Sequence, residues 1–175
     1  DQGIIGCGQP TFNWGWNNTF NYKNFDFSFF VVGFHGFDIY NATHQMGYNL
    51  IKNQQVAGVT PMRELLNRWT PTNTNTNIPG FVNGGTENKD FFSTRFVENG
   101  SFIKMKSITL GYTLPETACR ALGITNLRVY ASVQNPFHIT NYSGLDPEAT
   151  MGSPLVQGVD WGSYPNSRTY LIGLN

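Results

Sequence analysis

The feature that most constrains this chain is a strand pattern whose apolar face has no evident partner in the sequence. From Ile108 to Leu114, apolar residues alternate with Thr and Gly. A two-residue period of this kind is typical of a β-strand with one apolar face. The segment that follows, Pro115 to Gly123, allows about one helical turn and supplies no apolar run. Something other than the next segment must therefore cover the apolar half of this strand.

The same alternation recurs along the chain and predicts five strands, near residues 12–22, 25–35, 102–114, 127–139 and 168–175. Short turns are expected after the first and third strands, at Lys23–Asn24 and Pro115–Gly123. The other two connections, near residues 36–99 and 141–167, are long and lack a sustained period, although a helical fragment is expected at 61–69. Long loops of this kind are usually functional or disordered.

The composition is unusual for a water-exposed domain. Only 13% of the 175 residues are charged, about half the usual ~25%, while 15% are aromatic. Lys and Arg together number 11, as do Asp and Glu, so the chain lacks the basic footprint of a nucleic-acid-binding protein. The longest apolar run, Phe27 to Phe34, is far shorter than the ~20 residues of a membrane helix. Any crossing of a membrane would therefore use strands.

Two architectures fit these strands. In a soluble β-sandwich, such as a carbohydrate-binding module, the apolar faces share a core and the polar faces meet water. In a transmembrane β-barrel, the apolar faces meet lipid and the polar faces line the lumen. The polar faces here carry Asn, Ser, Thr and Gly rather than Lys, Glu and Arg, which favours the barrel. Because known bacterial barrels start at eight strands, the prediction is an all-β, antiparallel segment of a larger transmembrane barrel.

Several stretches also resemble a known family. SFIKMKSITLGYTLPE, NLRVYASVQNPFHITNYSGLDPE and SYPNSRTYLIGLN occur here in this order. Together they closely resemble the C-terminal end of SusC/RagA-like TonB-dependent transporters from the outer membrane of Bacteroidetes. The opening FNWGWNNTFNYKNFDFSFFVVGFHGFDIYN is similar to the same family slightly upstream. The resemblance covers most of the chain and is weakest from Gln45 to Asp90.

The resemblance implies a 22-stranded barrel that holds an N-terminal plug and takes energy from the TonB complex. It implies a SusD-like surface lipoprotein as partner, outer-membrane lipid around the wall, and oligosaccharide or sometimes peptide as cargo. Residues 1–175 would be the C-terminal part of the barrel. The plug and the TonB-contacting segment are absent from this chain, and the last strand would continue a few residues past Asn175.

A topology follows from the alternation of short and long connections. In such barrels short turns are periplasmic and long loops are extracellular. Cys7 and Cys119 would then lie at opposite ends of the wall, too far apart for a disulfide bond. Lys104 and Lys106 are expected to interrupt the apolar face where the third strand leaves the membrane. The polar face around Gly111 is expected to line the lumen and leave room for the plug.

No catalytic, metal or cofactor site is predicted, and the protein is not expected to be an enzyme. His35, His44 and His138 are scattered along the sequence and form no metal-binding motif. Asp146 and Glu148 could suggest the carboxylate pair of a glycoside hydrolase. Since they lie two residues apart in a Pro-containing turn, they are expected to organise the loop by accepting backbone hydrogen bonds.

The best candidates for contact with cargo or partner lie in the long loops. They are Trp69, Asp160, Trp161 and Tyr164. Flat aromatic rings provide apolar contact with a sugar face, and neighbouring Asp or Asn side chains can bind hydroxyl groups. The alternative is that these side chains pack the loops or contact the lipoprotein.

Overall fold

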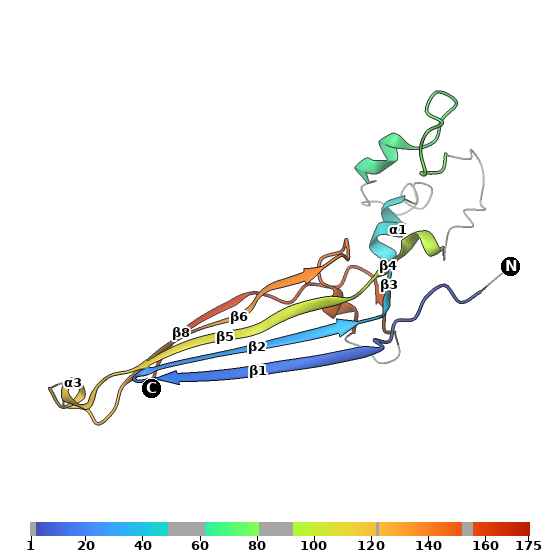
Figure 1. Ribbon diagram of the computed structural model, residues 1–175. Coiled ribbons are helices and arrows are strands. Elements are labelled where there is room, and N and C mark those ends of the chain that lie inside the picture. Colours follow the sequence, from blue (N-terminus) through green and yellow to red (C-terminus); the bar gives the residue numbers. More distant parts are fainter. Residues whose placement is uncertain (1–2, 49–61, 81–92, 122, 152–155) are drawn as a thin grey trace.

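The computed structural model describes residues 3–48, 62–80, 93–121, 123–151 and 156–175. Its main body is an antiparallel sheet of five long strands (Figure 1). In the order β1-β2-β5-β6-β8, they are β1 (Phe12–Tyr22), β2 (Phe25–His35), β5 (Phe102–Thr113), β6 (Arg128–Thr140) and β8 (Thr169–Leu174). The five predicted strands are thus confirmed, each to within one residue at either end.

Both short connections lie at one end of the sheet, here called the turn end (Figure 1). Lys23, between β1 and β2, has a φ of +53°, and a left-handed residue of this kind closes a tight hairpin. The helix α3 (Glu116–Ala121) joins β5 to β6. Gly123 follows α3 with a φ of +71°, a conformation that Gly adopts without steric cost. The predicted turns are therefore confirmed.

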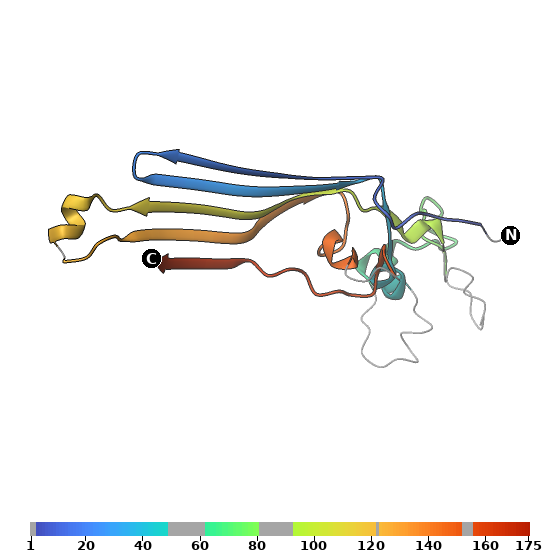
Figure 2. The same ribbon diagram turned by 90° about the horizontal axis from the view of Figure 1, so that it is seen from below.

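The sheet forms a single layer. Figure 1 and Figure 2 show the long strands lying side by side, and within the described residues no second sheet packs along their length. The apolar face stays bare along its length: Phe20, Leu110 and Ile172 are 55%, 50% and 82% exposed. A sandwich would bury these side chains in a shared core, so the alternative of a soluble β-sandwich is wrong for the part of the chain that the structure describes.

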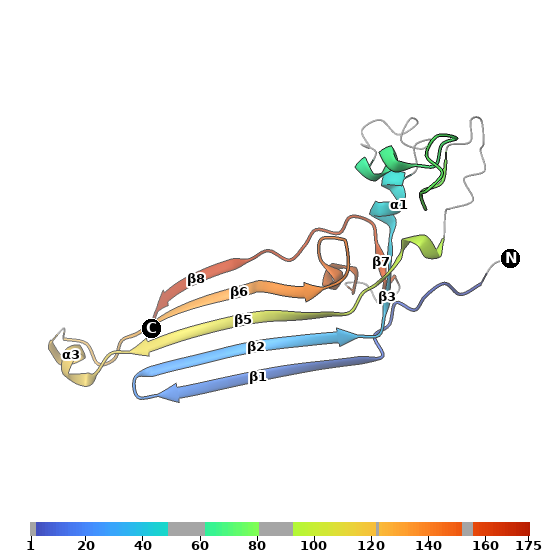
Figure 3. The same cartoon turned by 45° about the horizontal axis from the view of Figure 1, so that its top comes forward.

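The opposite end, here called the loop end, carries structure that the sequence pattern did not predict. A small sheet of order β4-β3-β7 lies there (Figure 3). Its strands are β3 (Asp38–Asn41), β4 (Val97–Asn99) and β7 (Val159–Asp160). The nearby helices are α1 (Ala42–Tyr48), η1 (Arg63–Asn67), η3 (Thr94–Phe96) and η4 (Pro147–Met151). Within the described ranges, every helix is too short or too polar to cross a membrane.

The buried apolar residues also gather at the loop end. One cluster joins the strand ends to the loops and consists of Val32, Phe37, Ile39, Phe102 and Tyr142. The predicted helical fragment at 61–69 is present as η1, while Pro61 lies outside the described residues. The protein core therefore sits beyond the bare part of the sheet rather than beneath it.

A β-bulge in β5 changes which way its lysines point. Ser107 pairs with Phe30 and Met105 pairs with Val31, so Lys106 is an extra residue between them. Such an insertion moves the residues beyond it to the other face. Lys104 therefore lies on the polar face with Ser107, while Met105 continues the apolar face. The expectation that the two lysines interrupt the apolar face is wrong because the bulge reverses the alternation.

The polar face near the turn end is also more filled than expected. Arg128 Nε donates a 2.9 Å hydrogen bond to Asp26 Oδ1, and Arg128 Nη2 pairs with Asp26 Oδ2. A Cβ added at Gly111 would collide with both side chains. The space expected for a plug above Gly111 is thus occupied by an ion pair that joins β2 to β6 across β5.

The two cysteines lie at opposite ends of the sheet, as the predicted topology requires. The Cys7 carbonyl accepts a hydrogen bond from the Asp38 amide at the loop end. Cys119 is buried in α3 at the turn end. Both thiols are free.

Candidate functional site

The four predicted contact residues all lie at the loop end, in two separate places. Trp69 follows η1, in the first long loop. Asp160 ends β7, and Trp161 and Tyr164 come directly after it. The structure thus places Asp160, Trp161 and Tyr164 in one part of the loop end, and Trp69 in another part, beside a hollow of its own.

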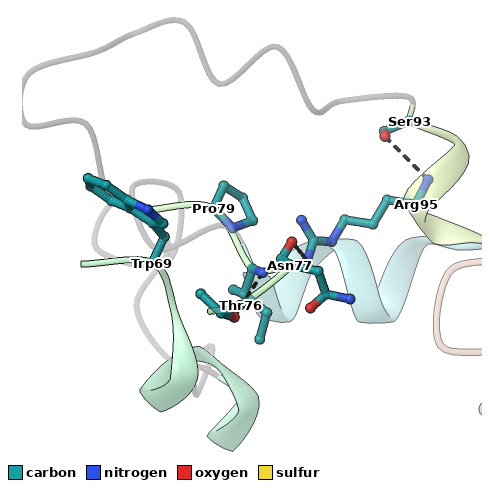
Figure 4. A pocket seen from close by; sticks show the side chains of 8 residues that line it. Trp69, Thr76, Asn77, Pro79, Ser93 and Arg95 are labelled. Atoms are coloured by element: carbon teal, nitrogen blue, oxygen red, sulfur yellow. Dashed lines mark hydrogen bonds between the residues drawn. The ribbon is translucent and has the colours of Figure 1, made fainter. Parts of the chain in front are cut away.

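The hollow beside Trp69 has a volume of about 540 Å³ (Figure 4). It is lined by Trp69, Thr76, Asn77, Ile78, Pro79, Gly80, Ser93 and Arg95. The Trp69 amide donates a 2.8 Å hydrogen bond to the Ile78 carbonyl, which holds the two sides of this loop together. Figure 4 shows the indole ring beside Pro79, with the Arg95 side chain reaching toward Asn77. The hollow combines an aromatic ring, amide groups and one cation.

Arg95 links this hollow to the helix α1. Its guanidinium donates a 2.8 Å hydrogen bond to the Asn77 carbonyl and lies 5.3 Å from the centre of the Tyr48 ring. The Tyr48 hydroxyl in turn donates to Glu64. Burial, together with this hydrogen bond, raises the pKa of Tyr48 to about 12. The same hydrogen bond holds the pKa of Glu64 below its ordinary value. Arg95, the charged residue of this hollow, and Glu64 behind it therefore already have hydrogen-bonding partners.

Asp160 is a buried loop organiser, 5% exposed. It accepts hydrogen bonds from the Tyr142 hydroxyl at 2.6 Å and from the amides of Gly162 and Ser163 at 2.9 and 3.0 Å. Burial, with the Asp160 hydrogen bond added, raises the pKa of the Tyr142 hydroxyl. Three donors thus occupy the Asp160 carboxylate, and its contact with cargo stays a prediction.

Trp161 and Tyr164 extend from this organised turn. They are 57% and 89% exposed, so their rings are available to a ligand or a partner. Tyr164 lines a hollow of about 590 Å³ against the sheet. The other lining residues are Phe34, Lys106, Glu148, Ala149, Ser163 and Asn166. The contact of Trp161 and Tyr164 with cargo or partner also stays a prediction.

The prediction that Asp146 and Glu148 organise their loop by accepting backbone hydrogen bonds is confirmed for Asp146, while the Glu148 carboxylate accepts from the side chains of Lys104, Lys106 and Asn166. Asp146 accepts hydrogen bonds from the amides of Glu148 and Asn166, at 3.0 and 3.1 Å. Sequence reasoning missed their cationic partner. Lys104 Nζ lies 2.8 Å from Asp146 Oδ2 and 2.7 Å from Glu148 Oε2, and its side chain is only 2% exposed. The sequence shows the run Lys104-Met105-Lys106, with two charges on the side that strict alternation makes apolar, but it does not show the inserted residue.

The part of the chain that the structure describes contains no group of three or more His, Cys, Asp or Glu side chains that could hold a metal ion. His44 lies 3.6 Å from both Glu64 and Glu98, which makes it a member of the loop packing. The chemistry that this end of the molecule offers is binding through aromatic rings, amides and hydroxyl groups.

Comparison with curated proteins gives relatives along the whole chain, although no family model matches. TonB-dependent receptors P3 and P26 of Formosa agariphila are 36% and 32% identical over 100% of the chain. TonB-dependent receptor SusC of Bacteroides thetaiotaomicron is 33% identical over 92% of it. The chain spans 17%, 18% and 14% of these relatives, or about a sixth of their length.

Solved structures of one such transporter also match the chain. The RagAB peptide importer in its closed-closed state matches 98% of the chain with a TM-score of 0.77 and 26% identity. Its open-open state matches 95% with a TM-score of 0.75. The chain covers 18% and 17% of those two chains. The bare single-layer sheet and these likenesses together show that the chain belongs to the SusC/RagA-like TonB-dependent transporters, as a segment of their transmembrane β-barrel.

Proposed function

We propose that this chain forms part of the wall and the outer loops of an outer-membrane TonB-dependent importer. The observation that carries the proposal is the five-stranded sheet with an uncovered apolar face, combined with similarity to such receptors along the whole chain. Lipid covers an apolar sheet face without any second protein layer.

The two faces then have distinct surroundings. Trp14 and Trp16 near the loop end, and Tyr22 and Phe25 near the turn end, lie on the apolar face, where aromatic girdles of a barrel meet the two membrane interfaces. The polar face lines the lumen. The turns at Lys23–Asn24 and around α3 are periplasmic, and the loops at the other end are extracellular.

The cargo is an oligosaccharide or a peptide. Trp69, Trp161 and Tyr164 are 47%, 57% and 89% exposed, and each lies beside polar groups of its loop. This combination suits ligands that carry both apolar surfaces and hydrogen-bonding groups. We assign these three residues, with Asp160 holding the turn that carries two of them, to contact with cargo or partner. Since the chain is about a sixth of its relatives' length, other parts of the transporter share the cargo site.

The partners are a SusD-like lipoprotein at the outer surface and the TonB complex, which other parts of the transporter contact. Exposed apolar side chains at the loop end, such as Leu145 at 69% and Trp161 at 57%, provide surface for the lipoprotein. Tagged full-length transporter should co-purify a lipoprotein of this class. Recovery of the transporter alone, under detergent conditions that preserve its barrel, would contradict the partnership.

The membrane assignment is tested by neighbouring residues on opposite faces. In the full-length transporter, Leu110→Arg should cost ~2–4 kcal/mol of folding free energy, because it places a charge against the lipid core. Thr109→Arg points into the lumen and should cost much less. The measurement is urea-driven unfolding of the protein reconstituted in lipid vesicles. Equal costs for the two substitutions would contradict the assignment of faces.

The import role is tested by growth. A Bacteroidetes host that lacks its own SusC-type importer is supplied with the full-length transporter and its lipoprotein, and is grown on defined glycans or peptides as the sole carbon source. Growth on at least one of them is expected. Trp161→Ala should raise the concentration needed for half-maximal growth if this ring contacts cargo, with assembly of the lipoprotein complex unchanged. Absence of growth on every source, despite correct assembly, would contradict import of these cargo classes.

A further inference from the structure

The buried cation Lys104 lies where the second long loop (residues 141–167) meets the sheet. Because of the β-bulge at Lys106, Lys104 projects from the polar face of β5. With Lys106, Asp146 and Glu148 it forms the group here called the Lys104 cluster. Lys106 Nζ pairs with Glu148 Oε1, so the cluster holds two positive and two negative charges. The charges balance, and the Lys104 and Asp146 side chains are 2% and 3% exposed.

The cluster fastens both ends of the second loop to the same strand. Asp146 and Glu148 come from the start of that loop and Asn166 from its end. Asp146 Oδ2 accepts one hydrogen bond from Lys104 Nζ, at 2.8 Å, and one from the Asn166 amide, at 3.1 Å. Glu148 Oε2 accepts one hydrogen bond from Lys104 Nζ, at 2.7 Å, and one from Asn166 Nδ2, at 2.8 Å. The Asn166 hydrogen bonds hold the two ends of the loop to each other, and Lys104 fastens the two carboxylates that accept them to β5.

The hollow lined by Tyr164 is built from the same residues. Lys106, Glu148 and Asn166 belong to the cluster or bind to it, and Ser163 and Tyr164 come shortly before Asn166. Phe34, on the neighbouring strand β2, supplies the wall on the sheet side. The shape of this hollow therefore depends on the contact between the loop and β5.

We propose that Lys104 is a positioning residue for cargo binding, which holds the two ends of the second loop, residues 146–148 and 163–166, as a fixed part of the inner wall, so that the hollow beside Tyr164 is formed before cargo arrives. The inference rests on the proposed function as an importer. A buried ammonium between two carboxylates resists separation, because opening the contact would leave charges without partners in a poorly hydrated place. A preformed hollow binds more tightly than a mobile loop, since the cost of ordering the loop is met during folding.

The first test measures the mobility of the loop directly. In the full-length transporter with Cys7→Ser and other accessible cysteines removed, Ser163→Cys carries a nitroxide spin label in the hollow. An immobile spectrum is expected with Lys104, a mobile one with Lys104→Met, and an immobile one again with Lys104→Arg. An immobile label in Lys104→Met would overturn the proposal, and so would a label that stays mobile in Lys104→Arg.

Two further variants keep the test decisive. If Lys104→Met alone does not assemble, Lys104→Met is combined with Asp146→Asn and Glu148→Gln, which leaves no unpaired carboxylate. The label should then be mobile, and an immobile label would overturn the proposal. Arg128→Met serves as the matched control, because it breaks an ion pair on the same face at the turn end. The label should stay immobile in this variant; equal loosening would mean a general effect on the barrel and would overturn the proposal.

The second test measures the functional consequence. On the carbon source that supports growth through the transporter, Lys104→Met should raise the concentration for half-maximal growth about tenfold at equal protein abundance, as expected when preorganisation is lost. An unchanged concentration, with a loosened label, would overturn the role in cargo binding. If the transporter supports no growth at all, the proposed import function fails, while the spin label still decides whether Lys104 holds the loop.

Discussion

The two ends of the polar face each hold an ion pair, and the two pairs differ in their surroundings. At the loop end, the Lys104 and Asp146 side chains are 2% and 3% exposed. At the turn end, the Arg128 and Asp26 side chains are 29% and 27% exposed. Breaking a buried pair leaves a charge without water or partner, whereas an accessible pair exchanges its partner for solvent. Similar contacts on one face should therefore differ strongly in what their loss costs.

The two pairs also depend on different local features of β5: an extra residue at the loop end and a missing side chain at the turn end. At the loop end, an inserted residue turns Lys104 toward the polar face. At the turn end, Gly111 has no side chain, and the Asp26–Arg128 pair crosses the strand at that point. One strand thus fastens a loop at one end and permits a cross-strand contact at the other.

The largest effect is expected from Lys104→Met. Removing one member of a buried ion pair costs ~3–5 kcal/mol, because Asp146 and Glu148 are left undercompensated. Hydrogen exchange of the Asn166 amide in the full-length transporter should report this loss. Adding Asp146→Asn and Glu148→Gln should recover part of the stability, even though the loop stays loosened. A cost no greater than that of Arg128→Met would remove the distinction between the two ends.

Acidification should loosen the same loop by a smaller amount. Burial would raise the pKa of Asp146 and Glu148, but the hydrogen bonds and charges of the neighbouring lysines hold both below their ordinary values of 3.8 and 4.5. Carboxyl groups with a lowered pKa contribute stability that is complete above the ordinary values and is lost as the pH falls through the lowered ones. Spin-label mobility at Ser163→Cys should thus be unchanged from neutral pH down to about pH 5 and rise below the ordinary values. A rise that begins near neutral pH would contradict this assignment.

Tyr142→Phe should have an intermediate effect, confined to the loop end. It removes the 2.6 Å hydrogen bond to Asp160, and hydrogen bonds to charged groups contribute ~1.5–3 kcal/mol. The Gly162 and Ser163 amides, which bind the same carboxylate, should exchange faster, while amides of β1 should not change. Unchanged exchange at Gly162 and Ser163 would show that the turn does not depend on this bond.

The smallest effects are expected at the turn end. Arg128→Met should destabilise the transporter less than Lys104→Met, since its ion pair is accessible to solvent. Arg120→Ala breaks a pair with Glu116 in α3 whose side chains are 82% and 85% exposed. The substitution should lower the free energy of unfolding by less than ~0.5 kcal/mol, as is usual for exposed ion pairs. Both are measured by urea-driven unfolding in lipid vesicles, and a cost for Arg120→Ala comparable to that of Lys104→Met would contradict the comparison.

Prediction from sequence succeeded where neighbouring residues decide the structure. The alternation from Phe12 to Tyr22 makes one strand face apolar whatever lies around it, because successive side chains point to opposite sides. The hairpin at Lys23–Asn24 and the end of α3 at Gly123 depend on backbone conformations of single residues. For the candidate site, the sequence located the loops and the exposed rings of Trp161 and Tyr164.

Prediction failed where distant segments meet. The strands β3, β4 and β7 are only four, three and two residues long, too short to show a period, and they form because segments far apart in sequence pair with each other. The Tyr142 hydroxyl that binds Asp160 lies 18 residues away in sequence, so the Asp160 carboxylate looked available to cargo. Lys104, the cationic partner of Asp146, lies 42 residues away and was missed for the same reason.

The sequence by itself determined the strands, the two short turns and the bare apolar face, because these follow from periodicity and from the conformations of single residues. Only the tertiary structure decided the face on which Lys104 lies, since a one-residue bulge is defined by pairing with β2 and leaves the composition of the strand unchanged. From that single insertion follow the burial of the ammonium, its two carboxylate partners and the attachment of the second loop to the wall.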